Sequence, residues 1–362
     1  MARNNEFRIA TLPGDGIGVE VMDACLEVLG AVERKVGGFR LIHEPHAAGA
    51  VCYQETGTDL PDSTYRAAEE ADAVLLGAMG LPDVRKADGT EINPQLDLRT
   101  GLELYAGVRP IKSMPGVPSA LSDERAKTID MVVIREQTEG LFIDIRAPRP
   151  ESDTEVSDRC LITRTGTERL SDFAFRLAAE RNKGGAPRVT CVDKANVLHS
   201  MAFFRKVFDE RAAAFPDVAA DHAYIDALAL NMVRNPWDYD VMVMENLLGD
   251  IISDLTAGLV GGMGLAPSAD LGDKHGLFQP CHGTAPDIAG RGLANPIAMF
   301  LSAAMMLDWL GERYGHESCV TAAGVLNQAI EDGFASGQIQ PAEFGGPHGT
   351  VEITKAVLER IT

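Results

Sequence analysis

Short apolar runs that alternate with amphipathic stretches are the feature that most constrains what this chain can fold into. Runs of strand length occur at 9–12, 74–76, 131–134, 189–192, 241–244 and 277–278. Apolar residues also recur at helical spacing from Val21 to Val32, and the longer stretch from Ile297 to Leu310, preceded by Pro296, predicts a helix. This alternation is typical of an α/β fold with helices on both sides of a sheet, and not of a sandwich or a helical bundle.

Length, charge and cysteine content narrow the class of protein. The 362 residues are enough for two domains, and the net charge of −20 disfavours nucleic acid or an anionic membrane surface as a partner. The start of the chain, MARNNEFR, is polar, and no apolar run approaches the ~20 residues that cross a bilayer. Six cysteines without a CxxC pair predict reduced thiols and a cytoplasmic protein. An anionic small molecule would be repelled unless local cations reverse the field.

The segment LPGDGIGVE, residues 12–20, places three glycines between a predicted strand and a predicted helix. In the Rossmann fingerprint, G-x-G-x-x-G, the third glycine would stand at position 19, but this chain has Gly18 and then Val19. Asp15 would also place a negative charge near a pyrophosphate, so both features argue against this fingerprint. A Walker A loop is excluded because no Gly-Lys-Ser/Thr follows. A tight strand-to-helix turn that needs positive φ explains the glycines equally well.

Two carboxylates stand at helical spacing after the apolar run 241–244. Asp250 and Asp254 are four residues apart, so both project from one face of a helix. Two carboxylates on one face repel each other unless a cation lies between them, and Mg²⁺ or Mn²⁺ prefers such oxygen ligands. The alternative is that both residues merely favour the first turns of a helix through its dipole.

Other charged residues lie beside apolar segments. Lys194 follows a strand-like run, and Asp226 ends a Tyr-Ile-Asp triplet. Arg99, Arg109 and Arg135 each lie beside apolar residues, and a guanidinium matches a carboxylate bidentately. Each residue alone is explained as a solvated side chain or a surface ion pair. Together the arginines predict a site for a dicarboxylate and the local positive field that the acidic chain otherwise lacks.

Six motifs in a fixed order carry a resemblance to a known family. They are LPGDGIG (12–18), Arg-x-x-Thr-Glu-Gly (135–140), VDKANVL (192–198), YID (224–226), NLLGDIISD (246–254) and HGTAPDIAGRGLANP (282–296). The sequence resembles the β-decarboxylating dehydrogenases, which include the isopropylmalate, isocitrate, homoisocitrate and tartrate/D-malate dehydrogenases. The resemblance runs from residue 8 to the end of the chain. In its motifs the chain is most similar to isopropylmalate and tartrate dehydrogenases.

The resemblance implies a two-domain α/β fold of the isocitrate/isopropylmalate dehydrogenase type, distinct from the Rossmann fold. Residues 1–104 and 261–362 would form a large domain that carries the cofactor loop. Residues 105–260 would form a small domain that carries the dimer interface and the metal carboxylates. It also implies a homodimer with shared active sites in the interdomain clefts, where Lys194 and Asp226 reach the partner's site.

The resemblance implies NAD-dependent oxidative decarboxylation of a 3-substituted malate. Mg²⁺ or Mn²⁺, held by Asp226, Asp250 and Asp254, would bind the substrate's 2-hydroxyl and carboxylate and acidify the hydroxyl. Lys194 and Asp226 would be the catalytic residues, with Lys194 accepting the proton directly or through water. The three arginines would hold the carboxylates. Loss of CO₂ would leave an enolate that must be protonated.

The resemblance also places the cofactor. The segment that would wrap the adenosine consists of His282, Gly283, Thr284, Ala285, Pro286, Asp287 and Asn295. An aspartate at 287 accepts hydrogen bonds from ribose hydroxyls and repels a 2′-phosphate, so we expect NAD. A helix cap after Pro286 is a compatible interpretation of Asp287.

Two residues depart from the family pattern. The run that begins at Arg135 normally ends in a tyrosine that helps to protonate the enolate, whereas this chain has Phe142, which has no proton to donate. Gln279 stands where the family usually has a glutamate, beside the cofactor loop. Water or another side chain would protonate the enolate, or the substrate needs no such step, or the chain is a less active relative.

The residues before Arg99 are expected to choose the substrate. Leu96 matches one of two leucines that form the apolar pocket of isopropylmalate dehydrogenases, but Gln95 stands beside it. An unpaired amide against an isopropyl group is unfavourable, so a malate, tartrate or isocitrate-like substrate is as well supported as isopropylmalate.

Two hypotheses of other classes complete the set. A non-catalytic regulatory subunit is favoured mildly by Phe142 and opposed by the intact lysine, aspartates and arginines. A phosphate-binding or transferase protein built on the glycine loop lacks the residues that such a loop requires.

Overall fold

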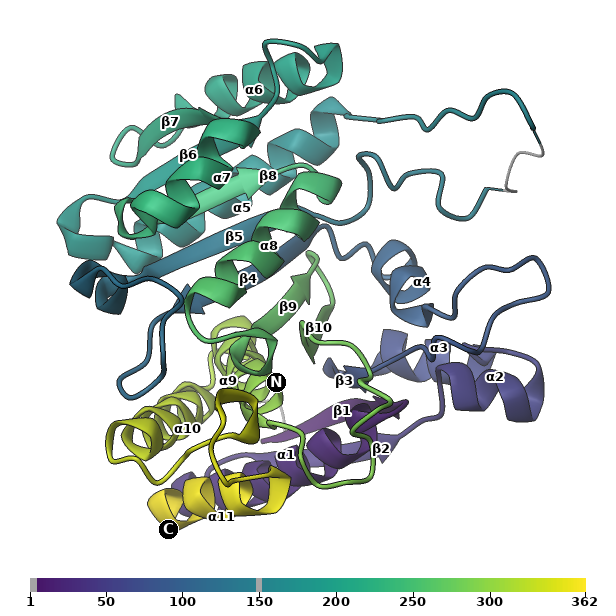
Figure 1. Cartoon of the computed structure of the whole chain (residues 1–362), viewed down its shortest axis with the longest axis vertical. Coiled ribbons are helices and arrows are strands. Elements are labelled where there is room, and N and C mark those ends of the chain that lie inside the picture. Colours follow the sequence, from purple (N-terminus) through teal and green to yellow (C-terminus); the bar gives the residue numbers. More distant parts are fainter. Residues whose placement is uncertain (1–4, 148–151) are drawn as a thin grey trace.

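The computed structural model describes residues 5–147 and 152–362, and its strands form one ten-stranded sheet in the order β2-β1-β3-β10-β9-β4-β5-β8-β6-β7 (Figure 1). The strands are β1 (Glu6–Gly14), β2 (Arg40–Pro45), β3 (Ala73–Ala78), β4 (Ala106–Lys112), β5 (Asp130–Glu136), β6 (Arg188–Asp193), β7 (Ala219–Tyr224), β8 (Val241–Met244), β9 (Pro267–Leu271) and β10 (Gly276–Pro280). Most neighbouring strands are parallel, and the antiparallel pairs β10–β9, β9–β4 and β4–β5 lie at the centre.

Helices cover both faces of this sheet. They are α1 (Ile17–Val36), α2 (Ala50–Thr56), α3 (Asp62–Glu70), α4 (Pro94–Gly101), α5 (Arg164–Arg181), α6 (His199–Ala212), α7 (Ile225–Arg234), α8 (Asn246–Leu259), α9 (Ile297–Tyr314), α10 (Glu317–Ala335) and α11 (Thr350–Ile361). Short 3-10 helices occupy Glu124–Thr128, Lys183–Gly185, Pro236–Asp238, Met263–Leu265 and Ala342–Phe344. Within the described ranges, no helix is both long and apolar enough to span a membrane.

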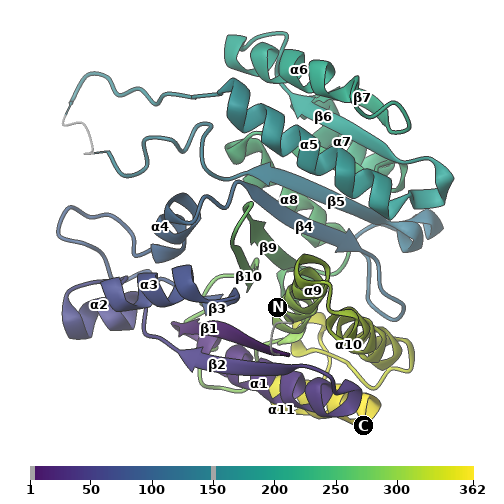
Figure 2. The ribbon, with the colours of Figure 1, turned by 180° about the vertical axis from the view of Figure 1, so that it is seen from behind.

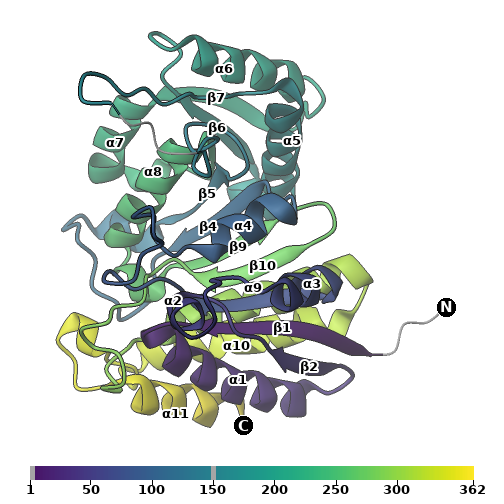
Figure 3. The same cartoon turned by 90° about the vertical axis from the view of Figure 1, so that its right-hand side faces the viewer.

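The alternation of side chains along the strands separates two layers of core. Residues such as Val108, Val132 and Ile134 belong to the large apolar cluster that includes α1, α5, α9 and α10. Met131 and Val133, one residue away, belong to the cluster beneath α7 and α8. Figure 1 shows α7 and α8 in front of the sheet, Figure 2 shows α5, α9 and α10 on the other side, and Figure 3 shows the strands passing between these layers. The α/β fold with helices on both faces is therefore confirmed.

The first and last thirds of the chain lie side by side. Helix α1 packs against α11, and β3 pairs with β10, while β4 to β8 and α5 to α8 form the other half of the molecule. The β9–β4 pair joins the halves, and the sheet is continuous across it. The proposed division into domains 1–104 with 261–362 and 105–260 falls close to this pair and stays a prediction.

All six predicted strands and the helix from Ile297 are present, but the apolar pattern missed β2, β4, β7 and β9. Strand β7 is an edge strand whose side chains are largely exposed, so it has no apolar run. Strands β4 and β9 carry Arg109 and Asp270 in their interiors. Buried charges therefore interrupted the hydrophobic pattern at the centre of the sheet.

The glycine loop is a close-packed turn between β1 and α1. Gly14 and Gly16 have φ of 76° and 55°, and a Cβ at Gly16 would lie 2.2 Å from the carbonyl oxygen of Thr284. The Asp15 carboxylate is buried and accepts hydrogen bonds from the backbone nitrogens of Ala50 and Gly80 at 2.7 and 2.8 Å. Asp15 therefore holds the start of α2 and the end of β3, and its charge is satisfied by backbone donors.

Candidate active site

A pocket of about 430 Å³ lies on the α8 side of the sheet, where the ends of β3 and β10 meet α4 and α8. It brings together most of the residues that the sequence singled out, although they come from distant parts of the chain. Its lining includes Gln95, Leu96, Arg99, Arg109, Arg135, Phe142, Asp250, Asp254, His282 and Gly283.

The strand register places the arginines on one face of the sheet. Gly107 pairs with Arg135 of β5 on one side and with Asp270 of β9 on the other, and Arg109 lies two residues further along β4. Cross-strand partners and residues two apart share a face, so these three charged side chains point toward the pocket. Arg99 reaches the same place from the last turn of α4. Burial leaves the side chains of Arg99, Arg109 and Arg135 only 8%, 5% and 7% exposed.

Each buried guanidinium has a different set of partners. Arg99 Nε lies 2.7 Å from Asp270 Oδ2, and Arg109 Nη2 lies 3.5 Å from Asp270 Oδ1. Arg135 donates through Nε to Asn246 Oδ1 at 2.9 Å and through Nη1 to Asp250. Burial and then the charge of Arg99 lower the pKa of Arg135 to about 10, so it stays protonated at neutral pH. The pocket therefore brings three guanidiniums and the carboxylates of Asp250 and Asp254 together inside an acidic protein.

Helix α8 presents two carboxylates to the same pocket. It begins after Glu245, whose side chain accepts hydrogen bonds from the nitrogens of Leu247 and Leu248. Asp250 and Asp254 then follow on one face, as their spacing predicts, and both line the pocket. Burial and the neighbouring charge of Asp250 raise the pKa of Asp254. Across the residues that the structure describes, no three His, Cys, Asp or Glu side chains converge on one metal position.

Lys194 and Asp226 lie outside this pocket. Lys194 follows β6 and Asp226 lies in the first turn of α7, where Lys194 Nζ is 2.5 Å from Asp226 Oδ1. The pair is partly exposed, and hydrogen bonding to Lys194 lowers the pKa of Asp226. Within one chain, Asp226 is therefore not brought together with Asp250 and Asp254.

The predicted cofactor segment borders the pocket and the glycine loop. Thr284 donates a hydrogen bond to the carbonyl oxygen of Gly80 at 2.7 Å, and its own carbonyl accepts from Ile17 N at 2.9 Å. Asn295 donates to Glu343 at 3.1 Å. Burial lowers the pKa of His282, which favours its neutral form.

Asp287 lies exposed in this segment. Residues 286–290 form a turn, so the alternative interpretation of Asp287 as a helix cap is wrong. Ala285, with φ of 36°, shows how tightly the chain bends just before it. The carboxylate of Asp287 is consequently available to an external partner.

Phe142 lies where the family pattern has a tyrosine. Its ring lines the pocket, and the Arg135 guanidinium carbon is 5.7 Å from the ring centroid. This cation–π geometry holds the ring at the edge of the pocket. A tyrosine hydroxyl on the same ring would be placed close to the arginine and the substrate space.

Sequence reasoning missed a buried polar group behind the arginines. Asp270 is fully buried and accepts hydrogen bonds from Gln137 Nε2 at 2.6 Å and Gln279 Nε2 at 3.1 Å, in addition to Arg99. Gln279, which departs from the family pattern, therefore lies inside the arginine cluster. The only available signal was an aspartate within the apolar stretch around Ala269 and Leu271.

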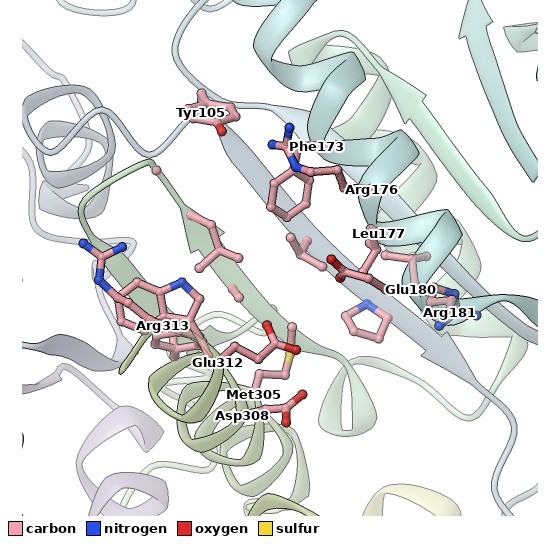
Figure 4. Close-up of a pocket in the computed structure, with 18 of the residues that line it drawn as sticks. Tyr105, Phe173, Arg176, Leu177, Glu180, Arg181, Met305, Asp308, Glu312 and Arg313 are labelled. Atoms are coloured by element: carbon pink, nitrogen blue, oxygen red, sulfur yellow. The ribbon is translucent and has the colours of Figure 1, made fainter. Parts of the chain in front are cut away.

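A second cavity, of about 650 Å³, lies on the opposite face of the sheet. Figure 4 shows its walls: Phe173, Leu177 and Glu180 come from α5, and Met305, Asp308 and Glu312 come from α9. Its floor includes Val108 and Ala269, the strand neighbours of Arg109 and Asp270. It contains none of the predicted site residues, because strand alternation sends them to the other face.

Comparison with known proteins defines the class. Residues 8–357 match the family described as isocitrate/isopropylmalate dehydrogenase. The chain therefore belongs to this family, and it is a decarboxylating dehydrogenase, as the motifs predict.

Relatives and solved structures agree with this assignment. The chain is 42% identical to the 3-isopropylmalate/3-methylmalate dehydrogenase of Methanocaldococcus jannaschii and 39% identical to the 3-isopropylmalate dehydrogenase of Methanothermobacter thermautotrophicus, over 98% of both chains in each case. It is also similar to a crystal structure of isocitrate dehydrogenase from Methylococcus capsulatus, with a TM-score of 0.85, 34% identity, and coverage of 98% of this chain and 99% of that one.

Glu136, next to Arg135 on β5, generates a prediction about pH. Its side chain is 1% exposed and accepts hydrogen bonds from Thr138 N and Thr138 Oγ1, both at 2.7 Å. Burial raises its pKa from 4.5 to about 7. Because the folded state holds this proton more tightly, the stability that the group contributes is complete below pH 4.5 and is lost as the pH rises through 7.

We expect Glu136→Gln to remove this dependence. Between pH 5 and pH 8, the wild-type free energy of unfolding should fall by about 3 kcal/mol more than that of the variant. Urea unfolding at several pH values measures the difference. Glu124→Gln, at a carboxylate 84% exposed, is the control and should follow the wild type. Parallel curves for wild type and Glu136→Gln would contradict the assignment.

Proposed function

We propose that this enzyme catalyses the NAD- and divalent-metal-dependent oxidative decarboxylation of a 3-substituted malate. The observation that carries the proposal is the pocket in which three buried arginines face the two carboxylates of α8. Guanidinium groups bind carboxylates, and paired aspartates bind Mg²⁺ or Mn²⁺, so one pocket offers partners for both parts of a metal-bound 2-hydroxy dicarboxylate.

The donor set fits a hard divalent cation. Asp250 and Asp254 supply carboxylate oxygens from one helix face. Burial and then the charge of Asp250 raise the pKa of Asp254, and a cation between the two carboxylates would relieve their repulsion. When bound, Mg²⁺ or Mn²⁺ supplies a Lewis acid that favours ionisation of the substrate hydroxyl, and NAD accepts the hydride. Arg99, Arg109 and Arg135 hold the substrate carboxylates and fix which carbon faces the cofactor.

The remaining groups come from a second copy of the chain in a homodimer with shared active sites. Lys194 and Asp226 stand outside their own pocket, as expected for residues that serve the partner's site. Apolar side chains near them are exposed to solvent in the single chain, namely Val197 (64%), Leu230 (55%), Val233 (55%) and, on α8, Ile251 (56%). Burial of this surface against a second copy would stabilise a dimer.

In that arrangement the proton has a defined route. Lys194 of one subunit, as the neutral amine, would accept the proton of the 2-hydroxyl, directly or through water, once Asp226 of the same subunit binds the metal and no longer pairs with the lysine. In the single chain the two side chains already form an ion pair, which keeps Lys194 Nζ beside Asp226 Oδ1. The catalytic lysine and the third carboxylate would therefore enter the pocket together.

Gln95 and Leu96 line the pocket and would contact the substituent on carbon 3 of the substrate. Gln95 Oε1 is buried and, within the described structure, accepts no hydrogen bond. Leu96 beside it is apolar. The relatives named for 3-isopropylmalate make that acid the leading substrate, while one of them is also named for 3-methylmalate. The free amide oxygen favours a second candidate, a malate with a smaller or polar 3-substituent such as D-malate, tartrate or isocitrate.

The exposed carboxylate of Asp287 favours NAD over NADP as the cofactor. A carboxylate at this position accepts hydrogen bonds from the two ribose hydroxyls and repels the 2′-phosphate of NADP. His282, Gly283, Thr284, Ala285, Pro286 and Asn295 would enclose the adenosine. The cytoplasmic location agrees with six cysteines that are all free thiols, and it stays a prediction.

A substrate panel tests the proposal. With Mn²⁺ and NAD, the purified protein should form NADH and CO₂ from at least one of 3-isopropylmalate, 3-methylmalate, D-malate, tartrate and isocitrate. EDTA should abolish the activity, and NADP should be at least about tenfold poorer. Asp254→Asn should lower kcat/KM by about 100-fold or more, whereas Asp308→Asn on the opposite face should not. No NADH from any acid would remove the catalytic proposal and favour a regulatory subunit.

Subunit mixing tests the shared sites. Lys194→Ala and Asp250→Asn should each be inactive, but mixed and allowed to exchange subunits they should recover about a quarter of wild-type activity, because half of the dimers are hybrids with one intact site. Lys194→Ala mixed with Asp226→Asn is the matched control and should recover nothing, because both residues serve the partner's pocket. No recovery in the first mixture would show that each chain builds its own site.

Phe142→Tyr asks how the enolate is protonated. Because the ring is held by Arg135, the variant places a hydroxyl at the pocket edge with little rearrangement. We expect kcat to change by less than about threefold, since water or another side chain already supplies the proton. Steady-state NADH formation measures this. A rise of about 100-fold, the size of a general-acid effect, would show instead that the missing phenol limits turnover.

A further inference from the structure

We propose that Asp270 is a positioning residue for substrate recognition: it is the buried counter-ion that fixes Arg99 and Arg109 for binding the substrate carboxylates. The inference rests on the proposed function of the pocket. It adds a residue that does not contact the substrate space itself, because Asp270 lies behind the arginines and does not line the pocket.

The contacts of Asp270 are all with donors. Its Oδ2 accepts from Arg99 Nε at 2.7 Å and from Gln279 Nε2 at 3.1 Å. Its Oδ1 accepts from Gln137 Nε2 at 2.6 Å and lies 3.5 Å from Arg109 Nη2. The hydroxyl of Ser268 lies 3.4 Å from Oδ1. Two guanidiniums and two amide nitrogens face this side chain, which is the environment of a carboxylate that accepts hydrogen bonds.

Charge explains why this buried group stays ionised. Burial opposes ionisation of Asp270, but the guanidiniums of Arg99 and Arg109 outweigh it and keep its pKa below the ordinary value. Conversely, neighbouring guanidiniums without a buried anion would repel one another, because like charges at short range raise the energy of the cluster. Asp270 therefore allows the cluster to exist before a substrate arrives.

The pairing also decides which nitrogens face the substrate. Arg99 donates through Nε, which leaves the terminal nitrogens of its guanidinium to the pocket. Arg109 faces Asp270 through Nη2, and its buried Nη1 has no hydrogen-bond partner in the described part of the chain. A buried donor without a partner is costly, so it marks the place where a ligand oxygen is expected.

The contact with Asp270 explains why residue 279 is a glutamine in this chain. Its amide nitrogen donates to Asp270 Oδ2, so a glutamate at 279 would place two carboxylates against each other in a buried site. The contact between residues 270 and 279 contains one carboxylate, which belongs to residue 270. An asparagine at 270 and a glutamate at 279 would keep one carboxylate and one amide at this contact.

Three variants of the full chain test the proposal. Asp270→Asn removes the charge at almost constant shape, and we expect the KM for the substrate to rise at least tenfold, while the KM for NAD changes less than about threefold. Asp270→Asn/Gln279→Glu moves the carboxylate across the contact and should return the substrate KM to within about fivefold of wild type. Asp273→Asn removes a carboxylate on the opposite side of the sheet and should leave both values unchanged.

A binding measurement separates this inference from the proposed reaction. Malonate, a small dicarboxylate, should raise the melting temperature of the wild type and of Asp273→Asn, and it should raise that of Asp270→Asn far less. This result would support the positioning role even if no acid in the substrate panel were oxidised.

Three outcomes would overturn the role of Asp270. The first is an Asp270→Asn variant with unchanged substrate KM and malonate response. The second is a fall in kcat together with a rise in the KM for substrate and in the KM for NAD, with no recovery in the double variant. That result is expected when the whole structure becomes less ordered. If Asp270→Asn does not fold, the third is a double variant that also fails to fold or to bind malonate.

Discussion

Three guanidinium groups are buried beside the centre of one sheet, and carboxylates lie against them: Asp270, which is fully buried, and Asp250, which is half exposed. An unpaired charge in a protein interior costs several kcal/mol, and three like charges add their mutual repulsion. Asp270 faces Arg99 and Arg109, and Asp250 faces Arg135. The rest of the site depends on this balance, because it keeps three guanidiniums together inside a chain whose net charge is −20.

The sheet supplies the geometry for that balance. Antiparallel pairing of β4 with β5 and β9 brings Arg109, Arg135 and Asp270 onto one face at adjacent positions. The alternate residues of the same strands, such as Val108 and Ala269, face the apolar layer on the other side. One set of strands therefore builds the polar pocket on one face and the second cavity, between α5 and α9, on the other. A shift of register by one residue would exchange the two faces and destroy both.

Some parts of the site could be read from sequence because their signals are local. The spacing of Asp250 and Asp254 predicts a shared helix face, and both line the pocket. The shifted glycine spacing argues against a dinucleotide fingerprint, and the loop proves to be a turn whose aspartate binds backbone nitrogens. Asp270 gave no local signal, because a single aspartate in a strand has no meaning until its neighbours across the sheet are known.

By itself, the sequence determined the α/β class and the family, and it indicated the arginines and aspartates of the candidate site, since periodicity and ordered motifs lie along the chain. Only the tertiary structure decided which of those residues meet. It joined the arginines with the α8 carboxylates, left Lys194 and Asp226 on another surface, and placed Gln279 against Asp270. The physical reason is that strand order and register bring together residues that are distant in sequence, such as Arg135 and Asp250 or Arg99 and Asp270, and no local pattern encodes those contacts.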